Sequence, residues 1–217
     1  MRILGIPIQE VSYNWHGTLS RRTKTQYIIL HHVAASDRTP QEIHQEHLAR
    51  GWAGIGYHYL ISKNGTIYHG RPRDVIGAHC EGHNSESVGI SAVGNYETEQ
   101  MPPIQWKAIL DLVNELKAVY PGAKVVGHKE LYATACPGRN YPLEQLKAGI
   151  GPKEIIEEVL GMFKDVADGY WAKGSIERLA KMGLLAGDNQ GNFNPEKPIT
   201  RAEVAAVLDR LLQMFGK

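Results

Sequence analysis

A histidine and a cysteine stand eight residues apart in the stretch GHKELYATACPG, residues 127–138. Positions eight apart are separated by roughly 80° around a helix, so they do not share one helical face. Pro137 and Gly138 also disfavour a continuing helix. We therefore expect His128 to end the strand predicted by KVVGH and Cys136 to return from a loop. An imidazole and a thiolate on neighbouring backbone suit a borderline-soft cation, so the pair is a candidate half of a zinc site.

The other half of such a site is expected from His31 or His32, at the end of the apolar run YIILHH. Successive strand residues point to opposite faces, so at most one of the two histidines faces a given site. Two imidazoles and one thiolate leave the fourth tetrahedral position of zinc to water, as in catalytic sites. Zinc lowers the pKa of such a water to ~7, and a centre of this kind hydrolyses amides or esters at a polarised carbonyl.

The elements that position these residues are predicted by periodicity and by end signals. Residues 23–36 contain a short, β-branched apolar run that is typical of a buried strand. A helix is predicted at 39–51 from its end signals: Thr39 is the N-cap, Pro40 is at N1, and Glu42 completes a capping box. Further strands are predicted at 56–62, 66–70, 87–94 and 123–128, with a hairpin turn at KNG, and a further helix at 102–122. This mixture predicts an α/β domain with a mixed central sheet flanked by helices.

Composition and charge exclude several classes of protein. The formal net charge of +1 creates no global field that would attract nucleic acid, so we expect no nucleic-acid partner. No apolar run approaches the ~20 residues that a membrane-spanning helix requires. The N-terminus shows no signal-peptide pattern, and we expect none. Two cysteines make no disulfide framework, and Cys80 is interpreted as a small buried thiol.

Five segments occur together in a characteristic order: YIILHHVAAS, GWAGIGYHYLIS, GTIYHGRP, HNSESVGISAVGNY and GHKELYATACPG. Through these segments, the region 22–148 resembles the zinc N-acetylmuramoyl-L-alanine amidases. This is the type-2 amidase group, which includes phage amidases and peptidoglycan recognition proteins. The resemblance implies one zinc ion per chain, held by His31, His128 and Cys136, and peptidoglycan as the substrate.

The same resemblance implies catalytic roles for Tyr57 and Thr134. Tyr57, in GIGYHYLI, would lie beside the metal and stabilise the tetrahedral intermediate, and Thr134 occupies a place that some members fill with lysine. Some cytosolic relatives carry a glutamate where this chain has Ser91 and Ala92. The general base is therefore left unassigned. The implied reaction is cleavage of the amide between N-acetylmuramic acid and L-alanine by zinc-activated water.

Other histidines receive structural interpretations. His44 and His47 lie at i and i+3 on the predicted helix 39–51, and we expect them on its solvated face. His79 and His83 flank CEG in a loop and are candidates for lining a substrate groove.

The sequence predicts a second domain after a linker. We place an amidase domain at 1–148, a linker at 149–162 and a small all-α module at 163–217. The segments FKDV, YWAKGSIERLAKMGLLAG and GNFNPEKPITRAEVAAVLDRLL resemble one S-layer homology module. Such modules bind secondary cell-wall polymers, which implies this partner here.

Three residues of the module match polymer-gripping positions of that family: Asp165, Trp171 and Arg201. These modules usually occur in threes, whereas this chain has one. The resemblance therefore predicts either weak binding or association of three chains into a homotrimer.

The combined interpretation is a peptidoglycan hydrolase of the endolysin or autolysin type. We expect it to stay in the cytoplasm until lysis or to be released to the cell wall. Two alternatives stay open: a non-catalytic peptidoglycan-binding protein and a cytosolic amidase that recycles muropeptides. Relatives without activity commonly lack the cysteine ligand, so Cys136 favours catalysis.

Overall fold

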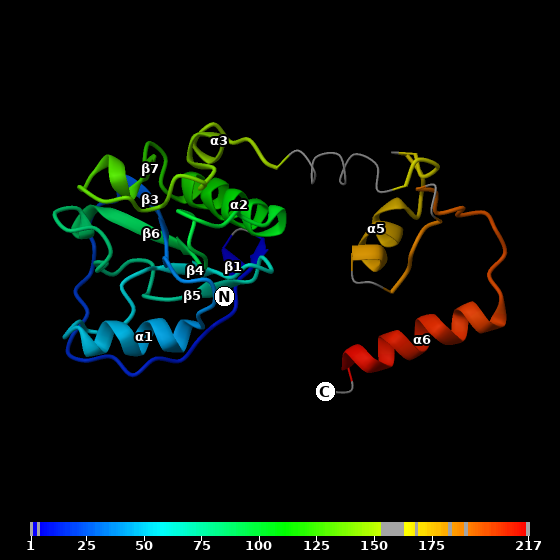
Figure 1. The fold of residues 1–217 in the computed structure, drawn as a ribbon, viewed down its shortest axis with the longest axis horizontal. Helices are drawn as coiled ribbons and strands as arrows, with labels where there is room; N and C mark the ends of the chain where they lie inside the picture. Colours follow the sequence, from blue (N-terminus) through cyan, green and yellow to red (C-terminus); the bar gives the residue numbers. More distant parts are fainter. Residues whose placement is uncertain are drawn as a thin grey trace. The chain divides into compact units, whose positions relative to one another are not determined.

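The computed structural model describes residues 2–3, 5–152, 163–167, 169–181, 184–188 and 191–215. The chain divides into two compact units, 1–155 and 156–217 (Figure 1). Most of the predicted linker, 153–162, lies outside the described residues.

A five-stranded sheet forms the centre of the first unit, in the order β5-β4-β6-β3-β7. Its strands are β3 (Tyr27–His32), β4 (Tyr59–Ile61), β5 (Ile67–His69), β6 (Ser87–Ala92) and β7 (Lys124–Gly127). The β4–β5 pair is antiparallel, whereas β4–β6, β3–β6 and β3–β7 are parallel. The predicted mixed sheet is therefore confirmed. A separate two-stranded ribbon pairs β1 (Arg2–Ile3) with β2 (Ile6–Pro7).

Helices cover both faces of this sheet. α1 (Pro40–Ala49) lies on one side, and α2 (Pro103–Val119) and α3 (Leu143–Lys147) lie on the other (Figure 1). The predicted capping box of α1 is present: Glu42 N donates to Thr39 Oγ1 at 3.2 Å, and Thr39 N donates to Glu42 Oε2 at 2.7 Å. Short 3-10 turns follow at η1 (Asn84–Glu86) and η2 (His128–Glu130).

The core shows which face of the sheet carries His31. Ile28 and Leu30 belong to the larger apolar cluster, which includes the buried side chains of α2 and α3. Side chains alternate along a strand, so Ile29 and His31 point to the opposite face. That face is the one covered by α1, where Ile43 and Leu60 belong to a smaller apolar cluster. The site is therefore built on the α1 side.

The second unit has two described helices, α5 (Lys173–Lys181) and α6 (Arg201–Phe215). Its small core contains Phe163, Val166 and Ile176. No strand occurs among its described residues, which confirms the predicted all-α character. Thr200 and Glu203 form a capping box at the start of α6: Glu203 N donates to Thr200 Oγ1 at 3.2 Å, and Thr200 N donates to Glu203 Oε2 at 2.7 Å.

Every helix in the described part of the chain is too short or too polar to cross a membrane.

Candidate metal centre

Three side chains with metal-binding atoms meet at the carboxyl ends of β3 and β7. Leu30 pairs with Gly127 in the parallel register, so the residues that follow lie side by side: His31 near the end of β3 and His128 directly after β7. Cys136 returns from the loop after η2, and its carbonyl accepts a hydrogen bond from Lys129 N at 2.8 Å. One ligand atom from each of His31, His128 and Cys136 lies within 4.8 Å of the other two. The structure thus brings together the three residues that the sequence singled out.

The donor set fits a zinc ion. The ring centroids of His31 and His128 are 4.5 Å apart, and Cys136 Sγ lies 3.7 Å from His31 Nδ1. His128 Nε2 is buried and has no hydrogen-bond partner among the described residues. A buried polar atom without a partner is costly, and a cation would satisfy it. Two imidazoles and a thiolate are ligands that zinc accepts.

Burial sets the protonation states of these groups. It lowers the pKa of His31 well below its usual value, and the neighbouring His128 lowers it further. Burial also lowers the pKa of His128 and raises the pKa of Cys136 to about 12. Both imidazoles are therefore neutral near pH 7, with a lone pair free to bind a metal. The Cys136 thiolate, in contrast, needs a compensating cation nearby.

Tyr57 and Thr134 offer hydroxyl groups near this cluster. The Tyr57 ring lies 5.3 Å from the His31 ring, and burial raises the pKa of Tyr57 to about 12, so it keeps its O–H at neutral pH. Thr134 Oγ1 accepts a hydrogen bond from Cys136 N at 3.2 Å, and this bond does not use the hydroxyl hydrogen. Both groups can therefore act as hydrogen-bond donors.

The expected solvent exposure of His44 and His47 is wrong. Their exposed fractions are 2% and 4%. His44 Nδ1 accepts from Ile55 N at 3.1 Å, and His47 Nδ1 accepts from Gly56 N at 3.0 Å. The pair therefore binds the backbone of the segment that leads to Tyr57. The i, i+3 spacing placed both histidines on one helix face, but no local signal identified the segment that crosses that face.

Arg71 completes this support of the segment 54–57. Its side chain donates to Ile55 O at 3.0 Å and to Gly54 O at 3.3 Å, and its backbone N donates to Tyr57 O at 2.8 Å. A Cβ at Gly56 would stand 1.9 Å from a backbone oxygen, so this position requires glycine. Side-chain bonds from His44, His47 and Arg71 thus add to the backbone bonds at Gly56 O and Tyr57 O, and together they hold the segment that carries Tyr57.

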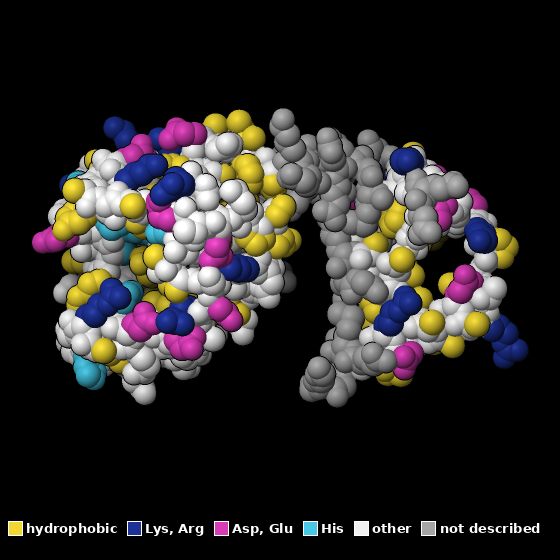
Figure 2. All heavy atoms as spheres, in the orientation of Figure 1, with side chains coloured by type: hydrophobic (Ala, Val, Ile, Leu, Met, Phe, Trp, Pro, Cys, Tyr) yellow, Lys and Arg dark blue, Asp and Glu magenta, His cyan; other side chains and the backbone are white. Residues whose placement is uncertain are grey.

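Aromatic rings continue on both sides of the cluster. Trp52 packs beside His47 with a centroid distance of 4.7 Å, and Tyr132 stacks on His128 at 5.6 Å. Trp52 and Tyr132 are 38% and 44% exposed. In Figure 2, histidine side chains are visible within a hollow on the face of the first unit. The sequence alone does not settle the role of Trp52 and gives no signal for Tyr132, because exposed aromatic residues have no periodic pattern.

The two loop histidines, His79 and His83, differ in burial and in their partners. His79 is buried, and its Nδ1 lies 3.0 Å from His31 Nε2, so it lies behind the cluster rather than along a groove. His83 is partly exposed, and its Nδ1 lies 3.0 Å from Glu86 Oε1.

A separate cavity of about 410 Å³ is lined by residues that include Trp106, Arg139 and Leu143. It contains none of the three candidate ligands, so we do not assign the chemistry to it.

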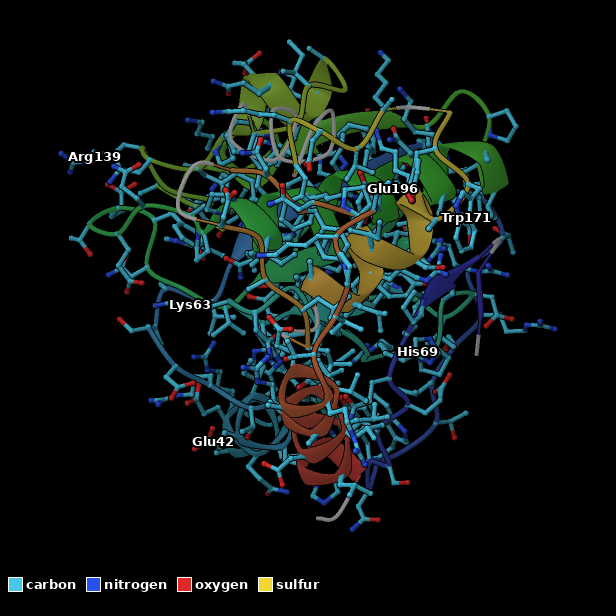
Figure 3. All side chains as sticks on the ribbon, turned by 90° about the vertical axis from the view of Figure 1, so that its right-hand side faces the viewer. Glu42, Lys63, His69, Arg139, Trp171 and Glu196 are labelled. Carbon is cyan, nitrogen blue, oxygen red and sulfur yellow. The ribbon has the colours of Figure 1, made fainter. Side chains whose placement is uncertain are left out.

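The second unit holds the predicted polymer-binding residues in three different segments. Trp171, labelled in Figure 3, precedes α5 and is 89% exposed. Arg201 is exposed and is the first residue of α6. Asp165 accepts hydrogen bonds from Phe193 N at 2.8 Å and Asn194 N at 2.6 Å. The Asp165 carboxylate is therefore engaged with the backbone of the module, whereas Trp171 faces solvent.

Comparisons with known proteins agree with this geometry. Residues 21–139 match the family described as N-acetylmuramoyl-L-alanine amidase, and residues 163–205 match the S-layer homology domain. An endolysin of Klebsiella phage KP32 is 36% identical over 126 residues, which cover 54% of this chain and 83% of the relative. Peptidoglycan-recognition protein SC2 of Drosophila melanogaster is 33% identical over 156 residues, which cover 64% of this chain and 84% of the relative.

A solved structure has the same fold. N-acetylmuramoyl-L-alanine amidase LysC from Clostridium intestinale URNW superposes with a TM-score of 0.64 and 39% sequence identity. The match covers 66% of this chain and 97% of that chain.

The burial of His47 predicts that the fold loses stability in acid. Burial, together with the cations Arg50 and Arg71 and the neighbouring His44, lowers the pKa of His47 to about 4, from 6.5 in the unfolded chain. The unfolded state therefore binds more protons between these values. Stabilisation by His47 is complete above pH 6.5 and is lost as the pH falls toward 4, with a loss of about 2–3 kcal/mol. Chemical denaturation at a series of pH values measures this slope.

The variant His47→Asn tests the source of the effect, because the Asn oxygen stands near the place of Nδ1 and does not titrate. We expect a flatter pH dependence of the free energy of unfolding in this variant. The control is His16→Asn, at an exposed histidine, which should retain the wild-type slope. An unchanged slope in His47→Asn would contradict the assignment.

Proposed function

Because the chain belongs to the N-acetylmuramoyl-L-alanine amidase family, we propose that it hydrolyses peptidoglycan with one zinc ion held by His31, His128 and Cys136. The observation that carries this proposal is the convergence of three ligand atoms within 4.8 Å at the carboxyl edge of two parallel strands. The bond cleaved is the amide between N-acetylmuramic acid and L-alanine.

The proposed mechanism assigns a task to each group. Zinc, when bound, polarises the scissile carbonyl and activates the attacking water. The Tyr57 O–H donates to the oxygen on which negative charge develops, and Thr134 supplies a second donor. Each such donor lowers the barrier by about 2.7–4 kcal/mol in well-studied enzymes. The amine of L-alanine then leaves after it is protonated.

The main alternative is a protein that binds peptidoglycan without cleaving it, since recognition proteins are among the relatives. The thiol of Cys136 favours catalysis, because it completes a three-ligand set that leaves a position for water. The recycling alternative would give a wall-binding module no purpose, and the match at 163–205 disfavours it.

Removal of the metal or of its sulfur ligand should abolish hydrolysis. We expect purified peptidoglycan to acquire new L-alanine amino termini, detected by mass spectrometry, and a chelator to stop this release until zinc is restored. Cys136→Ala should lower the rate of hydrolysis by more than about 100-fold. Mutation of a residue that only supports a metal ligand costs up to about 100-fold, and loss of a ligand itself should cost more.

Cys80→Ala is the matched control, because Cys80 is the other thiol of the chain, and it should retain activity. Full activity of Cys136→Ala would contradict the ligand assignment. New reducing sugar ends in place of amines would contradict the reaction.

We also propose that the chain is organised as an amidase domain at 1–148, a linker at 149–162 and a wall-binding module at 163–217. The match to the S-layer homology domain supports a cell-wall role for the last part. Trp171 is exposed, and Arg201 opens α6, where the helix dipole adds to the attraction of an anion. An anionic secondary cell-wall polymer is the proposed ligand, and the enzyme acts at the wall after its release.

Trp171→Ala should weaken binding to isolated cell walls by at least about fivefold, since stacking of an aromatic ring contributes about 1 kcal/mol or more. Cosedimentation with walls measures this change. Hydrolysis of soluble muropeptides should stay unchanged, and so should wall binding by Lys197→Ala, an exposed position of the same unit. Unchanged cosedimentation of Trp171→Ala would remove Trp171 from the proposed site.

We further propose that three chains associate through this module. α6 carries three large apolar side chains one turn apart on its exposed surface. The exposed fractions of Val204, Leu208 and Leu212 are 40%, 52% and 71%. Light scattering should give the mass of a trimer at high concentration, and Leu208→Glu should return the mass to that of a monomer. A wild-type monomer at high concentration would contradict trimerisation.

A further inference from the structure

His79 occupies a space that two glycines leave open. A Cβ at Gly77 would stand 2.4 Å from His79 Cδ2, and a Cβ at Gly89 would stand 2.6 Å from His79 Cγ. Gly89 lies in β6, the strand next to β3, so the imidazole of His79 is packed against the sheet directly behind His31. This packing holds a buried polar ring in one orientation.

The hydrogen bonds of this ring fix the position of each proton. Ser87 Oγ lies 2.7 Å from the carbonyl oxygen of His83, which only accepts, so the serine hydrogen is used in that bond. Ser87 Oγ also lies 3.4 Å from His79 Nε2 and must accept there, which places a proton on His79 Nε2. The neutral imidazole of His79 then presents Nδ1 as an acceptor.

That acceptor determines the state of the candidate metal ligand. His79 Nδ1 lies 3.0 Å from His31 Nε2, so His31 donates from Nε2 and keeps a lone pair on Nδ1. His31 Nδ1 is the atom that lies 3.7 Å from Cys136 Sγ. A hydrogen-bond relay thus connects four residues: His31 donates to His79, His79 donates to Ser87, and Ser87 donates to the carbonyl oxygen of His83.

We infer that His79 and Ser87 are positioning residues that orient the His31 ring and keep Nδ1 unprotonated toward Cys136, so that this nitrogen binds the metal. This inference rests on the proposed function only in taking His31 as a zinc ligand. His79 is not one of the three candidate ligands and acts through His31. Loss of a partner that orients a ligating histidine typically lowers metal affinity by about 10–100-fold.

The first test measures the zinc affinity of the full-length protein by competition with a chromophoric chelator. His79→Leu should weaken zinc binding by about 10–100-fold. His79→Asn should recover most of the loss, because its side-chain oxygen stands near the place of Nδ1 and accepts from His31. The matched control is His83→Asn in the same loop, which should bind zinc as the wild type does. Wild-type affinity in His79→Leu, or equal losses in the Leu and Asn variants, would overturn the inference.

The second test separates the hydrogen-bond relay from packing. Ser87→Ala should weaken zinc binding in the wild-type background and have no further effect in His79→Leu, because the relay is already broken there. Additive effects of the two substitutions would contradict the relay.

The third test determines which ring nitrogen of His31 carries the proton when metal and substrate are absent. Nitrogen NMR of the zinc-free wild-type protein should find the His31 proton on Nε2, and a proton on Nδ1 would overturn the inference. Failure of the proposed function looks different: the wild-type protein would then bind no zinc or release no L-alanine termini, while this spectrum would still report the state of His31.

Discussion

The parallel pairing of β3 with β7 is the constraint on which the candidate site depends. The register sets Leu30 opposite Gly127, so His31 near the end of β3 and His128 directly after β7 lie at the same edge of the sheet. A slip of one residue would turn one imidazole to the other face, toward the larger apolar cluster. The buried apolar side chains of β3 prevent such a slip, since Ile28 and Leu30 pack in that cluster. Burial of apolar surface on one face thus fixes the geometry of the polar face.

Around this edge, side chains satisfy backbone groups that no strand pairs. His44, His47 and Arg71 bind the segment before Tyr57, and His79 lies behind His31. Buried polar groups of this kind are costly unless each has a partner, and together they restrict the segment to one conformation. Burial lowers the pKa of His47 and of His79, so these two imidazoles stay neutral near pH 7. Rigidity at the site is therefore obtained from polar contacts as well as from apolar packing.

The sequence predicted the elements whose signals are local. The capping box of Thr39 and Glu42 marked the start of α1, and the β-branched run before His31 marked β3. Spacing alone left His31 and His32 open as ligands, and the resemblance to the zinc amidases implied the three residues that the structure brings together. The burial of His47 and the role of His79 were not predictable, because their partners lie in segments that only the tertiary fold brings near. Periodicity reports which face of an element a residue occupies, but it does not report which distant backbone covers that face.

X-ray absorption spectroscopy of the zinc-loaded wild-type protein identifies the atoms bound to zinc. We expect one sulfur at ~2.3 Å from zinc, two imidazole nitrogens at ~2.0–2.1 Å, and one light atom from solvent. A spectrum without a sulfur neighbour, or with a third imidazole in place of solvent, would contradict the proposed centre.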